Sequence, residues 1–80
     1  MDSQEINYVD CKSILVINAT GKMRQLFVPF RVQVILDSST FKKGSWVIVD
    51  EVQTHKKFKL IYRIGMNWWQ YDLFRIAVVF

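Results

Sequence analysis

Basic and aromatic residues stand close together in the second half of the sequence. Lys42 and Lys43 shortly precede Trp46, and Trp68 and Trp69 follow a later turn that returns the chain to the same end of the fold. Basic side chains beside exposed rings are typical of surfaces that bind single-stranded nucleic acid, because cations contact phosphates while bases stack on the rings. These five residues are the candidate binding site. Alternation along a strand requires at least one of Trp68 and Trp69 to face the core.

A second basic group, Lys56, Lys57 and Lys59, follows the strand expected over residues 46–52. About eight extended residues, roughly 25 Å, separate the two groups, so they lie at opposite ends of a hairpin. Residues 41–80 carry seven Lys and Arg against three Asp and Glu, which places the whole surplus of the +4 net charge there. Such a surplus indicates an anionic partner or only keeps the domain soluble.

Residue types that catalyse reactions or bind metals are sparse. His55 is the only histidine and Cys11 the only cysteine, so neither a catalytic triad nor a histidine or cysteine metal site can be assembled. Asp50 and Glu51 are adjacent and point to opposite faces of a strand, which prevents them from working as a carboxylate pair. The three glycines are too widely spaced for a phosphate-binding loop. We therefore expect a protein that is not an enzyme and holds no cofactor or metal.

The composition indicates one folded domain over residues 1–80, of which residues 1–5 are expected to fray. The sequence is 51% hydrophobic and 15% aromatic, which is too apolar for disorder. The single cysteine leaves no internal disulfide, and the chain begins with polar and acidic residues where an export signal would be basic and then apolar. No apolar run approaches the ~18 residues of a membrane span. The expectation is a cytoplasmic protein with no membrane partner.

Residues 26–36 predict the strand around which the fold is built. Apolar residues occupy every second position from Leu26 to Leu36, which is the pattern of a strand with one buried face. Eleven extended residues span roughly 36 Å, too long to stay flat against the core of so small a domain. Pro29 lies on the opposite face and lacks a backbone donor, so we expect the strand to bend there.

Several other segments predict strands and turns. Residues 14–17 are apolar on both faces, which indicates a central strand or one that a partner covers. Residues 18–22 have turn chemistry and should join that strand to the long one as an antiparallel hairpin. The remaining predicted elements are strands over residues 46–52, 58–64, 68–71 and 75–80, with a 3₁₀ turn over residues 72–74.

The pairing of residues 46–52 with residues 58–64 is open between two registers. A three-residue loop places Glu51 opposite Lys59, whereas a four-residue loop places Val49 opposite Tyr62. The sequence does not distinguish between them.

Five or six antiparallel strands around one core predict an all-β fold, a small antiparallel barrel with at most a short 3₁₀ turn. Residues 39–49 resemble the turn of SH3-like barrels in which an aromatic residue, basic residues and glycine precede a β-branched strand. Trp68 and Trp69 are similar to the aromatic pair of those barrels. The resemblance implies an SH3-like topology, and an OB-like barrel is the alternative because it also begins from a long bent strand.

Apolar residues near both ends of the chain exceed what one small core can bury. Residues 14–17 and 77–80 are apolar on both faces, and the excess would form a hydrophobic patch or an open strand edge. A symmetric dimer that contacts through one of these terminal strands is the simplest remedy. We therefore expect a binding and assembly module that acts through protein–protein contacts and self-associates into a homo-oligomer. The alternative function is single-stranded nucleic-acid binding by the basic and aromatic surface.

Overall fold

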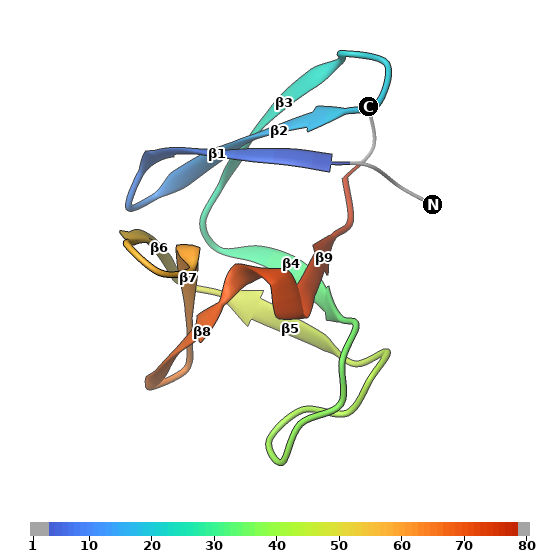
Figure 1. Ribbon diagram of the computed structural model, residues 1–80, viewed down its shortest axis with the longest axis vertical. Helices are drawn as coiled ribbons and strands as arrows, with labels where there is room; N and C mark the ends of the chain where they lie inside the picture. The colour runs from blue at the N-terminus through green and yellow to red at the C-terminus, as the bar shows by residue number, and fades with distance from the viewer. Residues whose placement is uncertain (1–3, 79–80) are drawn as a thin grey trace.

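The computed structural model describes residues 4–78, and within this range the chain forms nine strands and one 3₁₀ turn (Figure 1). Their order is β1 (Gln4–Asp10), β2 (Ser13–Asn18), β3 (Met23–Phe27), β4 (Phe30–Val34), β5 (Trp46–Val49), β6 (Glu51–His55), β7 (Lys59–Ile64), β8 (Asn67–Gln70), η1 (Tyr71–Leu73) and β9 (Phe74–Ile76). The strands form sheet A (β1-β2-β3), sheet B (β5-β4-β9) and sheet C (β6-β7-β8), and every pairing is antiparallel. The predicted all-β fold is confirmed.

The expected single barrel of five or six strands is not observed, because none of the three sheets closes on itself. Two predicted strands are each divided: residues 26–36 break at Pro29, and residues 46–52 break at Asp50. At each break the chain passes from one sheet to another, from sheet A to sheet B and then from sheet B to sheet C. The SH3-like topology and its OB-like alternative are therefore not confirmed.

The bend expected near Pro29 is confirmed, since β3 ends before this residue and β4 begins after it in another sheet. The buried row continues beyond the bend, where Phe30, Val32 and Val34 all lie in the core. Leu36, the last member of the predicted row, is 56% exposed because β4 has already ended. The period-two pattern thus identified the buried face correctly up to the end of β4.

The hairpin predicted at residues 18–22 is confirmed and joins β2 to β3. Asn18 Oδ1 accepts hydrogen bonds from the backbone amides of Thr20 (3.0 Å) and Lys22 (2.9 Å), while Gly21 supplies the positive φ of +86° that the turn needs. β2 lies between β1 and β3, so it is the central strand of sheet A.

The two ends of the described chain differ from the expectation. Gln4 and Glu5, two of the five residues expected to fray, belong to β1, whereas residues 1–3 lie outside the described residues. The last strand covers only Phe74–Ile76, and residues 79–80 of the predicted terminal strand are also outside the described range.

β6 and β7 pair in neither of the two registers considered. Glu51 lies opposite Arg63 and Val52 opposite Tyr62, with residues 56–58 as the connection. This register turns Val52 and Tyr62 toward the core, where both are fully buried. Burial of one face therefore excludes registers shifted by one residue, because such a slip would turn either Val52 or Tyr62 away from the core.

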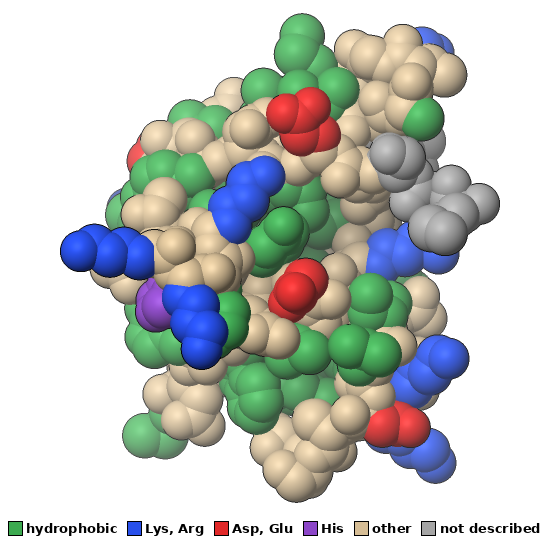
Figure 2. All heavy atoms as spheres, in the orientation of Figure 1, with side chains coloured by type: hydrophobic (Ala, Val, Ile, Leu, Met, Phe, Trp, Pro, Cys, Tyr) green, Lys and Arg blue, Asp and Glu red, His purple; other side chains and the backbone are tan. Residues whose placement is uncertain are grey.

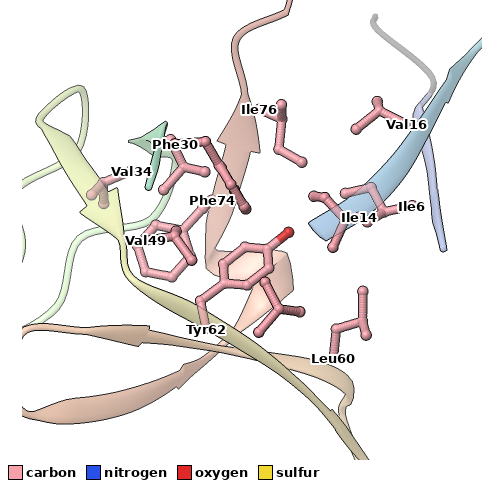
Figure 3. Close-up of a cluster of buried hydrophobic side chains, with 12 residues drawn as sticks. Ile6, Ile14, Val16, Phe30, Val34, Val49, Leu60, Tyr62, Phe74 and Ile76 are labelled. Atoms are coloured by element: carbon pink, nitrogen blue, oxygen red, sulfur yellow. The ribbon is translucent and has the colours of Figure 1, made fainter. Parts of the chain in front are cut away.

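A single hydrophobic core joins the three sheets (Figure 3). Its buried members come from every sheet: Ile6, Ile14, Val16, Phe30, Val32, Val34, Val49, Val52, Leu60, Tyr62, Phe74 and Ile76. Tyr62 is the largest of the fully buried side chains, and its ring meets Phe30 edge-to-face at 5.8 Å and Phe74 at 6.1 Å between centroids. In Figure 3 its hydroxyl oxygen points toward Ile14 of sheet A, so this side chain of sheet C packs on sheet B and faces sheet A.

Candidate functional site

The outer face of sheet C carries aromatic, polar and charged side chains. Because Tyr62 points into the core, strand alternation turns its neighbours on β7 toward the opposite face. There the register places Ile61 opposite Gln70 and Arg63 opposite Trp68. The face that β7 and β8 turn away from the core is therefore a mixed aromatic and polar surface.

A groove of about 350 Å³ opens on this side of the molecule, and we name it the aromatic groove. Its lining is apolar apart from one imidazole and one amide, and consists of His55, Phe58, Ile61, Trp68, Trp69, Gln70 and Leu73. Trp68 is 40% exposed and Phe58 is 36% exposed, so both rings are accessible to a ligand. This volume is at the small end of ligand-binding pockets and suits a single flat ring system.

The β6–β7 turn fixes the rings at one end of the groove. His55 Nδ1 accepts hydrogen bonds from the backbone amides of Lys57 (3.1 Å) and Phe58 (3.3 Å). The imidazole and the Phe58 ring stack with centroids 4.8 Å apart and planes at 30°. Lys59 then adopts a positive φ of 71°, and the Leu60 amide donates to the Phe58 carbonyl at 2.8 Å, which closes the turn tightly.

Basic side chains border the groove at this turn. Lys56, Lys57 and Lys59 are exposed, and Lys57 Nζ lies 5.5 Å from the centroid of the Phe58 ring in a cation–π contact. Figure 2 shows basic side chains gathered around the purple histidine at the left of the view. Among the described residues that line the groove, none is acidic. The turn is therefore the electropositive end of the aromatic groove.

The opposite end of the groove carries no surplus of positive charge, because one guanidinium faces two carboxylates there. Arg63, the cross-strand neighbour of Trp68, donates from Nε to Glu51 Oε1 at 3.2 Å and lies 4.0 Å from an Asp50 carboxylate oxygen. The guanidinium charge is thus shared between two carboxylates, so free positive charge is concentrated at the β6–β7 turn.

The structure does not bring all five residues of the predicted site into one groove: Trp68 and Trp69 line the aromatic groove, whereas Lys42, Lys43 and Trp46 do not. Trp46 is on β5 of sheet B, where the Arg31 guanidinium carbon lies 5.2 Å from its ring centroid. Lys42 and Lys43 are exposed on the long β4–β5 connection, which lies at the lower right of Figure 1. Trp68, in contrast, lines the aromatic groove together with Trp69 and with His55 and Phe58 of the β6–β7 turn, whereas Lys56, Lys57 and Lys59 border it.

Trp69 is the inward-facing member of the tryptophan pair, as strand alternation requires. It is half-buried, and its ring packs against Phe41 at 4.7 Å between centroids. Phe41 in turn meets Phe74 of the core at 5.7 Å. Phe41 therefore anchors the loop that carries Lys42 to the core beneath β8.

The sequence analysis placed Trp68 and Trp69 in a site but missed the other five members of the groove, of which His55 and Phe58 are the two at its basic end. His55 and Phe58 were interpreted as a loop histidine and the first residue of a strand, yet their stacked rings form the basic end of the groove. The available signal was the arrangement of two rings around Lys56 and Lys57, because a three-residue turn brings positions 55 and 58 together.

The outer face of sheet A is a second candidate surface. The other apolar residues of β2 are buried in the core, so alternation turns Leu15 and Ile17 to the opposite face, where both are half-buried. Beside them on β3, Met23 and Phe27 are each 64% exposed. We name these four residues the sheet A patch. In Figure 1 sheet A lies above the other two sheets.

Polar residues flank the sheet A patch on β1 and interrupt it on β3, where Gln25 lies between Met23 and Phe27. The register places Leu15 between Asn7 of β1 and Gln25 of β3, and Ile17 opposite Glu5. Aromatic and methionine side chains mixed with polar ones are the usual composition of a protein–protein contact surface. The patch therefore has the chemistry of an interface rather than of a small-molecule site.

Neither a metal centre nor a membrane helix is present in the described part of the chain. Within residues 4–78 no three His, Cys, Asp or Glu side chains are grouped so that they could hold a metal ion. The same residues contain no helix that is long and apolar enough to cross a membrane. Comparison of the chain with protein-family models, curated proteins and solved structures finds no match.

Proposed function

We propose that this protein is a non-enzymatic binding and assembly module that self-associates through the sheet A patch. The observation that carries the proposal is the two-faced strand β2. Ile14 and Val16 fill the core, while Leu15 and Ile17 remain half-buried on the other face of the same strand. Four consecutive apolar residues thus serve two surfaces, and the chain's own core accounts for only one of them.

The free energy gained by covering the sheet A patch comes from the hydrophobic effect. Each Å² of apolar surface removed from water contributes about 25 cal/mol, so a face that includes a methionine and a phenylalanine at 64% exposure favours association. Phenylalanine and methionine are enriched in interfaces, and methionine adapts its shape to a facing surface. Asn7 at the margin can form hydrogen bonds to water or to the partner, and the amide of Gln25 within the patch already donates to Ser13 Oγ at 3.2 Å.

A second copy of the chain is the simplest partner that could cover the sheet A patch. In a two-fold dimer the same patch covers itself, so no further complementary surface is required. Two sheets packed face to face lie about 10 Å apart and bury the side chains between them. Leu15 and Ile17 of the central strand would then lie in the middle of the interface, with Met23 and Phe27 toward one side.

Sedimentation equilibrium tests this proposal with a matched pair of variants. The wild-type chain should change from a monomer of 9.5 kDa toward twice that mass as its concentration rises from micromolar to millimolar. Met23→Lys should weaken the dimer by about 100-fold, because each substitution enters a two-fold interface twice at roughly 1.4 kcal/mol per site.

Met66→Lys is the control, because Met66 is 95% exposed on the β7–β8 turn and receives the same change. This variant should associate as the wild-type chain does. A wild-type mass that stays at 9.5 kDa over the whole range, or equal weakening by both variants, would overturn the proposal.

A further inference from the structure

The aromatic groove has the components of a stacking site. Phe58 and Trp68 present accessible rings to one space of about 350 Å³, which is bounded by the side chain of Ile61. A nucleic-acid base stacked on such a ring contributes about 1 to 3 kcal/mol, with little dependence on which base it is. The groove therefore offers room and aromatic surface for an unpaired base.

Positive charge lies where the backbone of a bound strand would pass. Lys56 and Lys57 are exposed beside Phe58, and Lys57 Nζ already lies over its ring at 5.5 Å from the centroid. A base in the groove beside Phe58 would bring its own phosphate to the same turn, where Lys59 is also exposed. The described lining holds no carboxylate that would repel it.

The two polar side chains of the lining can recognise base edges. Gln70 carries an amide that both donates and accepts hydrogen bonds, and His55 adds an imidazole whose Nδ1 already accepts from the turn backbone. Base faces are covered in a duplex and open in a single strand, so a stacking site selects single strands.

We propose that the aromatic groove binds single-stranded nucleic acid, with one base stacked on Trp68 beside the His55–Phe58 pair and the adjoining phosphates on the lysines of the β6–β7 turn. This site is on sheet C and is separate from the sheet A patch, so it does not depend on the proposed self-association. A dimer formed through sheet A would display two such grooves.

Titration with oligouridylate and oligothymidylate, followed by tryptophan fluorescence and anisotropy, tests the inference. Trp68 should report binding directly because it lines the groove. Three phosphate contacts predict a slope of about −2 in log affinity against log salt, hence roughly 20-fold weaker binding at 200 mM than at 50 mM salt. A double-stranded oligonucleotide of the same sequence should bind at least tenfold more weakly.

Two charge variants locate the site. Lys56→Glu with Lys57→Glu should weaken binding by at least about 30-fold and flatten the salt dependence. Lys42→Glu with Lys43→Glu changes the net charge by the same amount on the β4–β5 connection and should leave the affinity within about threefold. All four lysines are exposed, so neither variant should unfold the domain, which circular dichroism verifies.

A second matched pair tests stacking. Trp68→Ala should weaken binding by roughly 5- to 150-fold, whereas Trp46→Ala removes an equally exposed indole from sheet B and should have no effect. Absence of binding at low salt would overturn the inference, as would equal losses in the two charge variants. Competition by octaglutamate, a polyanion without bases, that is as strong as competition by unlabelled oligonucleotide would also overturn the inference. Such a result would show that binding requires only negative charge and no stacked base.

Discussion

Replacing Tyr62 with alanine is expected to lower the free energy of unfolding by about 3 to 5 kcal/mol. Tyr62 is the largest fully buried side chain, and it meets Phe30 and Phe74 of sheet B while belonging to sheet C. Its loss would leave a cavity where the sheets meet. A domain of 80 residues has roughly 4 to 12 kcal/mol of stability in total, so the variant should be largely unfolded or close to it. Urea unfolding followed by far-ultraviolet circular dichroism measures the change.

Tyr62→Phe is the control that keeps the ring. In the described structure the Tyr62 hydroxyl is buried without a hydrogen-bond partner, and an unsatisfied buried polar group costs about 1 to 3 kcal/mol. Removing only this oxygen should therefore stabilise the domain by about 1 kcal/mol. A loss as large as that of the alanine variant would contradict this role of the ring.

The same hydroxyl predicts a dependence on pH. Burial, and secondarily the nearby Tyr71, raises the pKa of Tyr62 above its ordinary value of 10.0. A raised pKa in the folded state means that the neutral form is favoured there, so its contribution is complete below pH 10 and is lost as the pH rises above it. The wild-type chain should lose stability above pH 10 more steeply than Tyr62→Phe does.

Protein concentration should shift the unfolding midpoint, which is the second large effect expected. Association stabilises the folded state by mass action, so raising the concentration to about 100 times the dissociation constant should add roughly 1.5 kcal/mol per protomer. For a domain of this size that corresponds to an increase of roughly 6 to 12 °C in the melting temperature. Calorimetry at several protein concentrations measures it.

The combined variant Met23→Lys and Phe27→Lys should abolish this concentration dependence while melting where the dilute wild-type chain melts. Both residues are 64% exposed, so lysine at either position should cost the monomer little. Met66→Lys should keep the full dependence. A midpoint that moves with concentration equally in all three chains would show that another surface makes the contact.

Sequence periodicity was sufficient to predict the buried face of β4 and the bend at Pro29, because alternation and proline chemistry act locally. The break at Asp50 was missed, although Val49 and Val52 are both buried and stand three apart, which a single regular strand does not allow. The change in the alternation of apolar residues between Val49 and Val52 is visible in the sequence. The transfer of β6 to another sheet could not be predicted from the sequence, because it depends on which strands pair across the core.

The candidate surfaces were predictable to different degrees. The two apolar faces of residues 14–17 were read from the sequence, and the structure assigns one face to the core. The position of Trp68 could not be predicted from the sequence. Its neighbours depend on the register of β7 and β8 and on the turn that stacks His55 on Phe58. Loop residues such as Lys42 could not be located from spacing alone, because Phe41 ties their loop to the core through Trp69.

An isotope-filtered NOE experiment on a mixture of labelled and unlabelled protein tests self-association through sheet A most directly. At concentrations where the dimer predominates, intermolecular cross-peaks should join the methyl groups of Leu15 and Ile17 to the same residues of the partner copy, with further peaks to Met23 and Phe27. Intermolecular peaks confined to other surfaces, or none at millimolar concentration, would contradict the proposed interface.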